Sequence, residues 1–295
     1  MFPKTIWERE RGMVAGRIVV ERAGGKSTVT KCFSKYPLKF IIPNKVAPSK
    51  TDAVWIYSLT YGGGIVSVVF RIQALVVSQV YKSLGSKCSQ QFLKATVGVD
   101  ALLAVIPDPV TCFSTARYRQ KQVFRVLSNS SLVLVDWFTS GRHENGERWN
   151  FDIYNSTNNI ILGDDQPVFL DTVLVEKGSI TTISERMLDY QVIAMVVLLG
   201  PKLKQIQCRV QENVKKMMSE ELNMHFTCLS GHAKSNGHCF SKPSLVASCS
   251  RFGPEDIGVV VRVAATTTES VYKFLQSQLA CLETLIGVLP YRGTC

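Results

Sequence analysis

The sequence of 295 residues lacks the features that mark secreted and membrane-spanning proteins. A membrane-spanning helix needs ~20 consecutive apolar residues, whereas the longest apolar run here covers only residues 192–199. Charged residues Arg9, Glu10 and Arg11 stand where a secretory signal would carry its apolar segment. The nine cysteines are odd in number and form no C-x-x-C pair, which favours reduced thiols over a disulfide framework. We therefore expect a cytoplasmic protein with no membrane partner.

Catalytic motifs are also absent. The chain has neither the G-x-S-x-G turn of hydrolases nor the H-E-x-x-H motif of zinc proteases. His143 is the only histidine in the first 200 residues, and its neighbours Arg142 and Glu144 indicate an exposed turn. These absences predict that the protein is not an enzyme. An enzyme whose site follows no known motif remains an alternative.

Two partial motifs point weakly to ligands. Residues 24–28 read Gly-Gly-Lys-Ser-Thr, but Val20 stands where a phosphate-binding loop needs its first glycine, and a strand pattern follows where the loop needs a helix. Thiol and imidazole ligands suited to zinc or nickel gather after residue 225, although their spacing matches no standard metal finger. They are Cys228, His232, His238, Cys239 and Cys249. A chance collection in a polar loop is the favoured interpretation.

The composition, with 46% hydrophobic and 19% charged residues, is typical of one globular domain over residues 1–295. Alternating polar and apolar residues predict short strands at 27–33, 54–57 and 122–127. A polar turn followed by an apolar strand recurs at 98–106 and 128–135, with a looser third copy at 176–183, which suggests stacked β layers.

Amphipathic helices are predicted only in the last third of the chain. We expect mostly β structure over residues 1–200, a helix at 201–222, a loop at 219–243, strands at 244–265 and a helix at 267–287. Thr266 and Glu269 form a capping-box pattern before the second helix. The predicted fold is mainly β, a layered β-helix-like stack of short strands with a C-terminal pair of amphipathic helices.

Positive charge is concentrated near the N-terminus. The formal net charge is +11, and residues 1–50 hold eleven Lys or Arg against three Glu. Arg117, Arg119 and Lys121 follow at strand period and would line one face. No nucleic-acid-binding signature accompanies this charge, so we expect no nucleic-acid partner. One functional alternative is a cytoplasmic binding protein that docks an acidic protein partner through its basic N-terminal third.

Acidic residues within the strand-rich region suggest a polar interior. In the turn Gly141-Arg142-His143-Glu144-Asn145-Gly146-Glu147, the guanidinium of Arg142 could pair with the carboxylate of Glu147. Asp171 follows Gln166-Pro167 by a few residues in a strand-like segment. Buried carboxylates are costly unless they are paired, hydrated or bound to a cation. If these acids face inward, the interior is wet.

In these residues the chain resembles the urease accessory protein D family, in particular its plant-type members. The resemblance covers about residues 14 to 290 and rests on short stretches that occur in the family's order. They are Gly25-Lys26-Ser27-Thr28, Tyr36-Pro37-Leu38-Lys39-Phe40 with Pro43, Tyr61-Gly62-Gly63-Gly64-Ile65-Val66-Ser67, Val80-Tyr81-Lys82-Ser83, Ile106-Pro107-Asp108-Pro109, Gly141-Arg142 with Gly146-Glu147, and Ile183-Ser184-Glu185-Arg186.

The resemblance implies a non-catalytic scaffold that binds apo-urease and an accessory protein F, which in turn recruits the GTPase G for nickel delivery. It implies a layered, helix-like stack of strands with a helix pair, and transient passage of nickel through an internal polar channel without a tightly bound cofactor. Asp136, Glu147 and Asp171 fall where the family carries acids, and Asp52 is a looser match. Carboxylate oxygens bind a hydrated divalent ion weakly enough to release it.

The segment at residues 68–79 departs from the family pattern. In the family the triple-glycine turn is followed by Gly-Asp and a β-hairpin that carries a lysine, whereas Ser67 here leads into a segment with neither the Asp nor the Lys and roughly ten residues shorter. A missing hairpin would remove a channel acid and leave neighbouring strand edges unpaired. The resemblance then implies a splice variant, a gene-model error or a diverged protein impaired in nickel delivery.

Overall fold

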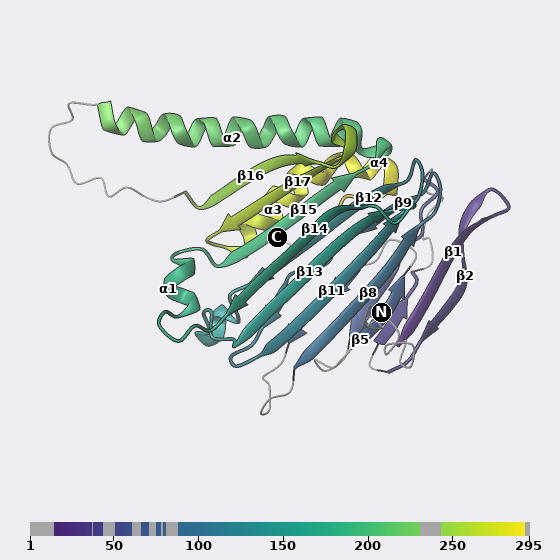
Figure 1. Ribbon diagram of the computed structural model, residues 1–295, viewed down its shortest axis with the longest axis horizontal. Helices are drawn as coiled ribbons and strands as arrows, with labels where there is room; N and C mark the ends of the chain where they lie inside the picture. The colour runs from purple at the N-terminus through teal and green to yellow at the C-terminus, as the bar shows by residue number, and fades with distance from the viewer. Residues whose placement is uncertain are drawn as a thin grey trace, which may run out of the picture.

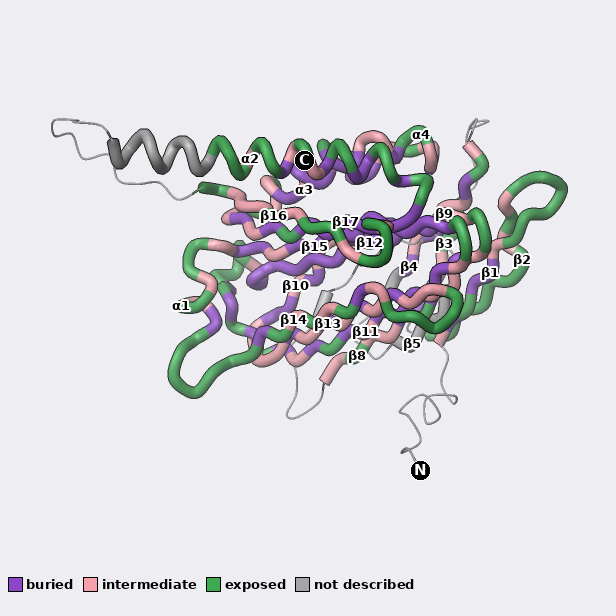
Figure 2. The backbone as a smooth tube through the Cα atoms, turned by 45° about the horizontal axis from the view of Figure 1, so that its top comes forward, coloured by how far each residue is buried: buried purple, intermediate pink, exposed green. Residues whose placement is uncertain are grey.

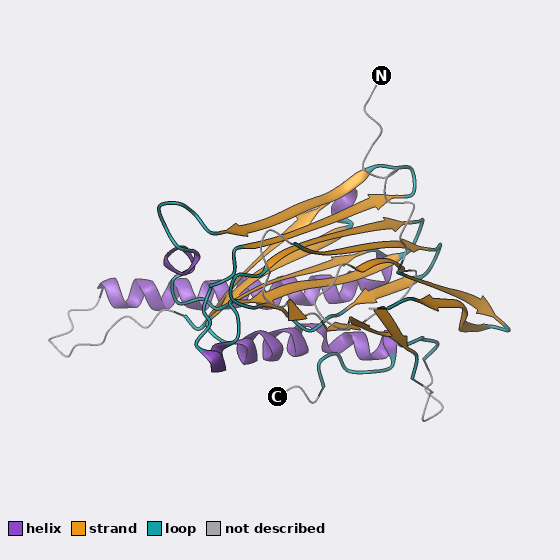
Figure 3. Cartoon of the chain, turned by 90° about the horizontal axis from the view of Figure 1, so that it is seen from below, coloured by secondary structure: helices purple, strands orange, loops and turns teal. Residues whose placement is uncertain are grey.

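The computed structural model describes residues 15–36, 38–43, 51–60, 66–70, 75–77, 79–80, 88–230 and 243–292. Two open β-sheets lie face to face, and the long helices cover the outer face of the second sheet (Figures 1 and 3). The architecture is therefore three layers, sheet on sheet on helix. Within the described residues, the helices are too short or too polar for any of them to cross a bilayer.

Each large sheet contains strands from distant parts of the chain. Sheet I runs in the order β14 (Pro167–Glu176), β13 (Ile153–Leu162), β11 (Arg117–Val126), β8 (Ser89–Val97), β5 (Val66–Phe70), β1 (Gly16–Ala23) and β2 (Lys26–Ser34). Sheet II runs in the order β16 (Leu245–Phe252), β17 (Gly258–Ala265), β15 (Val192–Leu199), β12 (Ser131–Thr139), β10 (Val110–Cys112) and β7 (Gln79–Val80), with β9 (Leu102–Val105) also paired to β12. A smaller sheet joins β3 (Leu38–Ile41), β4 (Tyr57–Thr60) and β6 (Leu75–Val77).

The helices follow or interrupt these strands. They are the 3₁₀ turn η3 (His143–Asn145), α1 (Ile183–Met187), η4 (Pro201–Leu203), α2 (Lys204–Ser230), η5 (Pro254–Asp256), α3 (Thr268–Leu279), η6 (Ala280–Leu282) and α4 (Glu283–Ile286). The mainly β fold with C-terminal helices is thus confirmed. The sheets are open at their edges, so a β-helix-like stack is not confirmed.

The chain passes back and forth between the two sheets from β8 to β13. β8, β11 and β13 are parallel neighbours in sheet I, and β9 and β12 are parallel neighbours in sheet II. Leu102 lies opposite Ser131, so the two turn-and-strand units predicted thirty residues apart do stack. The third unit was wrong, because Thr182 caps α1 through the backbone N–H of Glu185 and residues 183–187 are helical.

Two hydrophobic cores hold the three layers together. Between the sheets, Leu93 and Phe124 of sheet I pack with Leu134 of sheet II. Behind sheet II, Val135 packs with Val210 of α2 and other helix residues. Strand β12 lies between these cores and is buried along its whole length (Figure 2). A strand that is covered on both faces is expected to have a nearly continuous apolar sequence, and residues 132–135 of β12 have one.

Two predicted boundaries and one predicted capping box need correction. The loop expected at 219–243 was wrong at its start, because α2 continues to Ser230 and the helix projects beyond the sheets (Figure 1). The second helix begins one residue later than predicted, since Thr267 rather than Thr266 accepts a hydrogen bond from Ser270 N. Glu269 pairs with Lys273 one helical turn on, instead of completing a capping box.

The described residues of the departing segment, 68–70, 75–77 and 79, lie in strands of all three sheets. β5 lies between β1 and β8, β6 lies beside β4, and β7 lies beside β10. The expectation that a missing hairpin leaves neighbouring edges unpaired is wrong for β5 itself, which has a strand partner on both sides. It holds for β1, because only Gly16 and Arg17 pair with β5 and the rest of that edge has no strand beside it in the described part of the chain. The glycines Gly62, Gly63 and Gly64 lie outside the described residues.

Candidate polar site between the sheets

Asp136 is a carboxylate inside the sandwich. It continues the row of Leu132 and Leu134 on β12, whose side chains face sheet I, while Val133 and Val135 face the helices. Only 8% of Asp136 is exposed. Side-chain alternation along the strand therefore places an acid in the inter-sheet layer, where an apolar residue would be expected.

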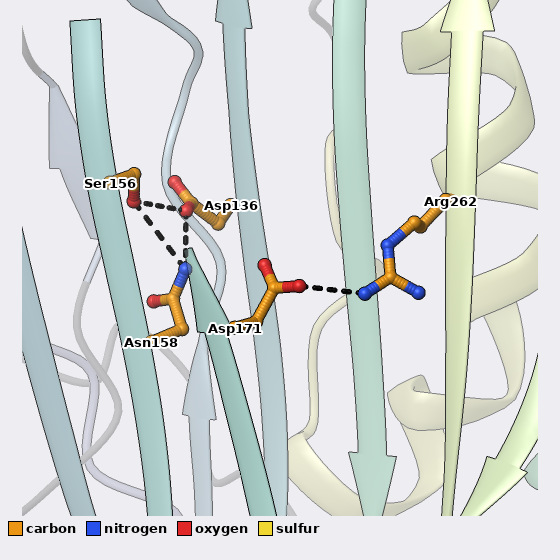
Figure 4. Close-up of polar contacts among 5 residues, drawn as sticks. All are labelled: Asp136, Ser156, Asn158, Asp171 and Arg262. Atoms are coloured by element: carbon orange, nitrogen blue, oxygen red, sulfur yellow. Dashed lines mark hydrogen bonds and ion pairs between the residues drawn. The ribbon is translucent and has the colours of Figure 1, made fainter. Parts of the chain in front are cut away.

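Three neutral donors from sheet I solvate this carboxylate. Asp136 Oδ1 accepts a hydrogen bond from Gln120 Nε2 at 3.1 Å. Its Oδ2 accepts from Ser156 Oγ and Asn158 Nδ2, each at 2.6 Å, and Figure 4 shows these two bonds. Burial raises the pKa of Asp136, the three hydrogen bonds oppose this rise, and the charge of Asp171 adds to it. The donors are all uncharged, so no cation within the described residues neutralises Asp136 by direct contact.

Asp171 extends the polar group toward the edge of the sandwich. It lies opposite Asn158 in the β13–β14 pair, on the same inward face. Its Oδ1 accepts a hydrogen bond from Arg262 of β17 at 2.7 Å, and its Oδ2 is buried without a hydrogen-bond partner among the described residues. The Asp171 side chain is 12% exposed and that of Arg262 is 52% exposed. Figure 4 shows Asp171 between the Asp136–Asn158 pair and the guanidinium.

The four predicted acids divide into two that meet and two that do not. Asp136 and Asp171 share this polar group through Asn158. Glu147 binds Arg142 through both carboxylate oxygens, at 3.0 and 2.5 Å, in the turn beyond β12. Asp52 accepts hydrogen bonds from the backbone N–H and hydroxyl of Ser27 on the exposed β1–β2 hairpin. The structure therefore does not bring Glu147 or Asp52 into the group around Asp136.

The turn at 141–147 has the geometry that its glycines suggest. Gly141 has φ +136° and Gly146 has φ +71°, both in the region that favours glycine. The Arg142 guanidinium also stacks 3.9 Å from the centre of the Phe113 ring. The ion pair expected between Arg142 and Glu147 is thus present, and it stabilises the turn.

The other candidate ligands do not form a site in the described part of the chain. His232, His238 and Cys239 lie outside it, and the side chain of Cys228 is not described. Cys249 is a free, half-buried thiol packed against the core under the helices. Across the described ranges, no three His, Cys, Asp or Glu side chains gather closely enough to hold a metal ion. His143 is exposed and contacts Ser140 Oγ at 2.8 Å within its own turn.

Several residues of the polar group were missed in the sequence. In β13, Tyr154, Ser156 and Asn158 alternate on the buried face, so a polar row at strand period was visible there. Arg262 is the only charged residue within the apolar run of β17, which is also a readable signal. Nothing in the sequence shows that Arg262 would meet Asp171, which lies 91 residues away.

Comparison with known proteins assigns the family. A family model described as UreD urease accessory protein matches residues 73–292. The chain belongs to the UreD family. It is 60% identical to urease accessory protein D of Arabidopsis thaliana over 293 residues, which cover 95% of this chain and 100% of the relative. The Oryza sativa subsp. japonica protein of the same name is 50% identical over 291 residues, which cover 94% of each chain.

The bacterial members are more distant. The UreD of Anaeromyxobacter sp. (strain Fw109-5) is 29% identical over 293 residues, covering 95% of this chain and 89% of the relative. The match to the UreD family model begins at residue 73, inside the departing segment 68–79. Strands β8 to β17, which supply every residue of the polar group, lie wholly within that match.

Proposed function

We propose that this protein is a non-catalytic accessory scaffold of urease maturation in the cytoplasm. It binds apo-urease and the accessory protein F, and it is joined to the GTPase G through F. The family membership supports the link to urease, because the relatives carry urease accessory protein in their names. Nickel is the cargo in this proposal, so it passes through the protein and is not a resident cofactor.

The observation that carries the nickel part of the proposal is the pair of buried carboxylates, Asp136 and Asp171. A charged carboxylate in a protein interior favours a nearby cation, and oxygen ligands suit a divalent ion that keeps part of its hydration shell. A site that binds a metal ion tightly uses more charged ligands than these two carboxylates, whose neighbours are uncharged amides and hydroxyls. Weak binding at such a place permits release, which transfer to another protein requires.

In this proposal the polar group also provides a route to the surface. It runs from Asp136 through Asn158 and Asp171 to Arg262, which is half exposed between β14 and β17. Asp52 and Glu147 lie elsewhere, so they form no part of this route in our proposal. The departing segment 68–79 stays a candidate cause of impaired delivery, because the family carries an acid there.

Co-expression with apo-urease and the F and G proteins tests the proposal. The wild-type chain is expected to co-purify with apo-urease and to support nickel-dependent urease activity. The variant Asp136→Asn/Asp171→Asn removes both buried carboxylates at nearly constant volume, and we expect it to capture apo-urease but to lower activation at limiting nickel. A matched control, Asp100→Asn/Glu144→Gln, removes two exposed carboxylates and is expected to behave as wild type.

Two results would contradict different parts of the proposal. Failure of the wild-type chain to capture apo-urease, with no rescue by a family-like hairpin inserted after Ser67, would refute the scaffold function. Restored capture and activation after that insertion would instead show that the segment 68–79 is what impairs this chain. Full activation by Asp136→Asn/Asp171→Asn, at equal amounts of complex, would refute the nickel route.

A further inference from the structure

The β1–β2 hairpin is an arm that projects from the sandwich. β1 pairs with β2 from Gly16 to Ala23, but its pairing with β5 covers only Gly16 and Arg17. Beyond that point the two strands pair only with each other. Ile18, Val20 and Val29 still pack against the inter-sheet core, whereas the exposed tip at residues 21–28 extends past the edge of sheet I (Figures 1 and 2). The turn is formed by Gly24 and Gly25, at φ +58° and +78°, as in the tight hairpin turns that suit twisted strands.

Asp52 holds this arm in place. Its two carboxylate oxygens accept hydrogen bonds from Ser27 N at 2.6 Å and from Ser27 Oγ at 2.9 Å, just after the turn. The following residues are tied to the helices, since Trp55 Nε1 donates to the carbonyl of Ile286. An isolated two-stranded hairpin is only marginally stable in water. The hydrogen bonds of Asp52 therefore help to hold the exposed tip of the arm in one position.

The arm carries a concentrated positive charge. The exposed cationic residues on it are Arg17, Arg22, Lys26 and Lys31, and Lys35 follows directly after β2. The only acid on the two strands is Glu21, which also accepts a hydrogen bond from Thr30 Oγ1 at 2.6 Å. None of the five cations forms an ion pair with a carboxylate among the described residues. Such a field attracts an acidic surface and speeds the encounter with it.

Two further features fit a polypeptide partner. β2 is the terminal strand of sheet I, so one row of its backbone N–H and C=O groups has no strand beside it in the described part of the chain. A free strand edge of this kind can pair with an extended peptide segment. At the base of the arm, Phe33 is 55% exposed and Tyr36 is 83% exposed, and aromatic residues are enriched in protein interfaces.

We propose that the β1–β2 hairpin is a docking arm for an acidic, extended segment of a protein partner. Charge on Arg22, Lys26 and Lys31 attracts the segment, the free edge of β2 pairs with its backbone, and Phe33 and Tyr36 pack against it. The proposal rests on the function proposed above for the identity of the partner, which is apo-urease. In this proposal the basic N-terminal region binds the partner at a surface away from the nickel route through Asp136.

Binding of the full chain to purified apo-urease at two salt concentrations tests this arm. The variant Lys26→Glu/Lys31→Glu reverses two charges on it, and the control Lys177→Glu/Lys202→Glu makes the same change of net charge at exposed sites elsewhere. At about 50 mM NaCl we expect the arm variant to bind roughly tenfold more weakly than wild type and the control to bind within about twofold. At about 500 mM NaCl the difference is expected to shrink, because salt screens exposed charges.

The other outcomes overturn the proposal in distinguishable ways. Equal weakening by both variants would show a non-specific effect of net charge, and equal affinity of the arm variant and wild type would exclude the arm from the interface. If the wild-type chain does not bind apo-urease at all, the proposed function fails, and this proposal fails with it. Phosphatidylserine vesicles and duplex DNA are tested in parallel. Loss of binding to either probe in the arm variant, with apo-urease binding unchanged, would replace the protein partner by a membrane or a nucleic acid.

Discussion

Replacing Arg262 by Met removes the only cation that contacts the Asp171 carboxylate within the described residues. The ion pair joins Arg262 to Asp171 Oδ1 at 2.7 Å, across the gap between β17 and β14. The second oxygen of Asp171 is buried without a hydrogen-bond partner in the part of the chain that the structure describes. The methionine retains much of the apolar stem of arginine, so the change acts mainly on charge. Asp171 would then be a largely buried carboxylate without its counter-ion.

The size of the effect follows from the exposure of the two partners. Removing one member of a fully buried ion pair costs about 3 to 5 kcal/mol, whereas exposed pairs contribute about 0 to 1 kcal/mol. Asp171 is 12% exposed and Arg262 is 52% exposed, which places this pair between the two limits. We therefore expect Arg262→Met to lower the free energy of unfolding by about 2 kcal/mol. Removing the charge as well, in Arg262→Met/Asp171→Asn, should restore about half of the loss.

Guanidinium denaturation at neutral pH, followed by circular dichroism, measures these differences. Lys273→Met is the control, because its pair with Glu269 is exposed on both sides and its loss should have a much smaller effect. The reasoning is refuted if Arg262→Met and Lys273→Met lower stability equally. It is also refuted if the losses from Arg262→Met and Asp171→Asn simply add in the double variant, since two residues in contact should be energetically coupled.

Three other substitutions test the fold and the site. Because burial raises the folded-state pKa of Asp136 above 3.8, the folded protein binds a proton more tightly than the unfolded chain between that pH and the raised pKa. The unfolding free energy of wild type should therefore fall relative to that of Asp136→Asn as the pH rises through this window. Denaturation at several pH values between about 4 and 8 measures both free energies. A difference between the two proteins that stays constant with pH would contradict the prediction. Leu275→Ala should cost about 3 kcal/mol, because Leu275 is fully buried between α3 and sheet II, and a loss below about 1 kcal/mol in urea denaturation would argue against that packing. Gly200→Ala should lower the stability of the protein far more than Gly146→Ala. Both glycines have positive φ, but only the new methyl group at 200 would clash with the backbone of Ser130. Similar melting temperatures of the two variants would contradict this prediction.

Local structure was largely predictable from the sequence. Residues 131–135 were predicted as a buried strand because no polar residue interrupts Leu132 to Val135, and β12 confirms it. The helix at 201–222 was predicted from apolar spacings of three and four, and these side chains do face the sheet at Ile206, Val210 and Val214. The end of that helix was misplaced, because residues 219–243 were interpreted as one polar loop. Leu222, Phe226 and Leu229 in fact continue the helical spacing of three and four, and α2 runs to Ser230.

The site was only partly predictable. Asp136 and Asp171 were selected as acids in strand-like segments, and both are largely buried, but Glu147 and Asp52 were selected by the same resemblance and lie apart from them. Gln120, Ser156 and Asn158 were missed because neutral polar residues in strands usually face solvent. Whether a polar residue faces inward depends on which sheet covers its strand, and that information is not local.

The sequence by itself determined most of the strands and helices, the concentration of positive charge near the N-terminus and the membership of the UreD family. These properties follow from periodicity, composition and ordered motifs, which are all read along the chain. Only the tertiary structure decided that Asp136 and Asp171 lie in one polar group, that Arg262 pairs with Asp171 and that basic residues stand on the β1–β2 hairpin. The reason is that strand order and register set which side chains share an interior, and sheets I and II bring together strands that are far apart in sequence.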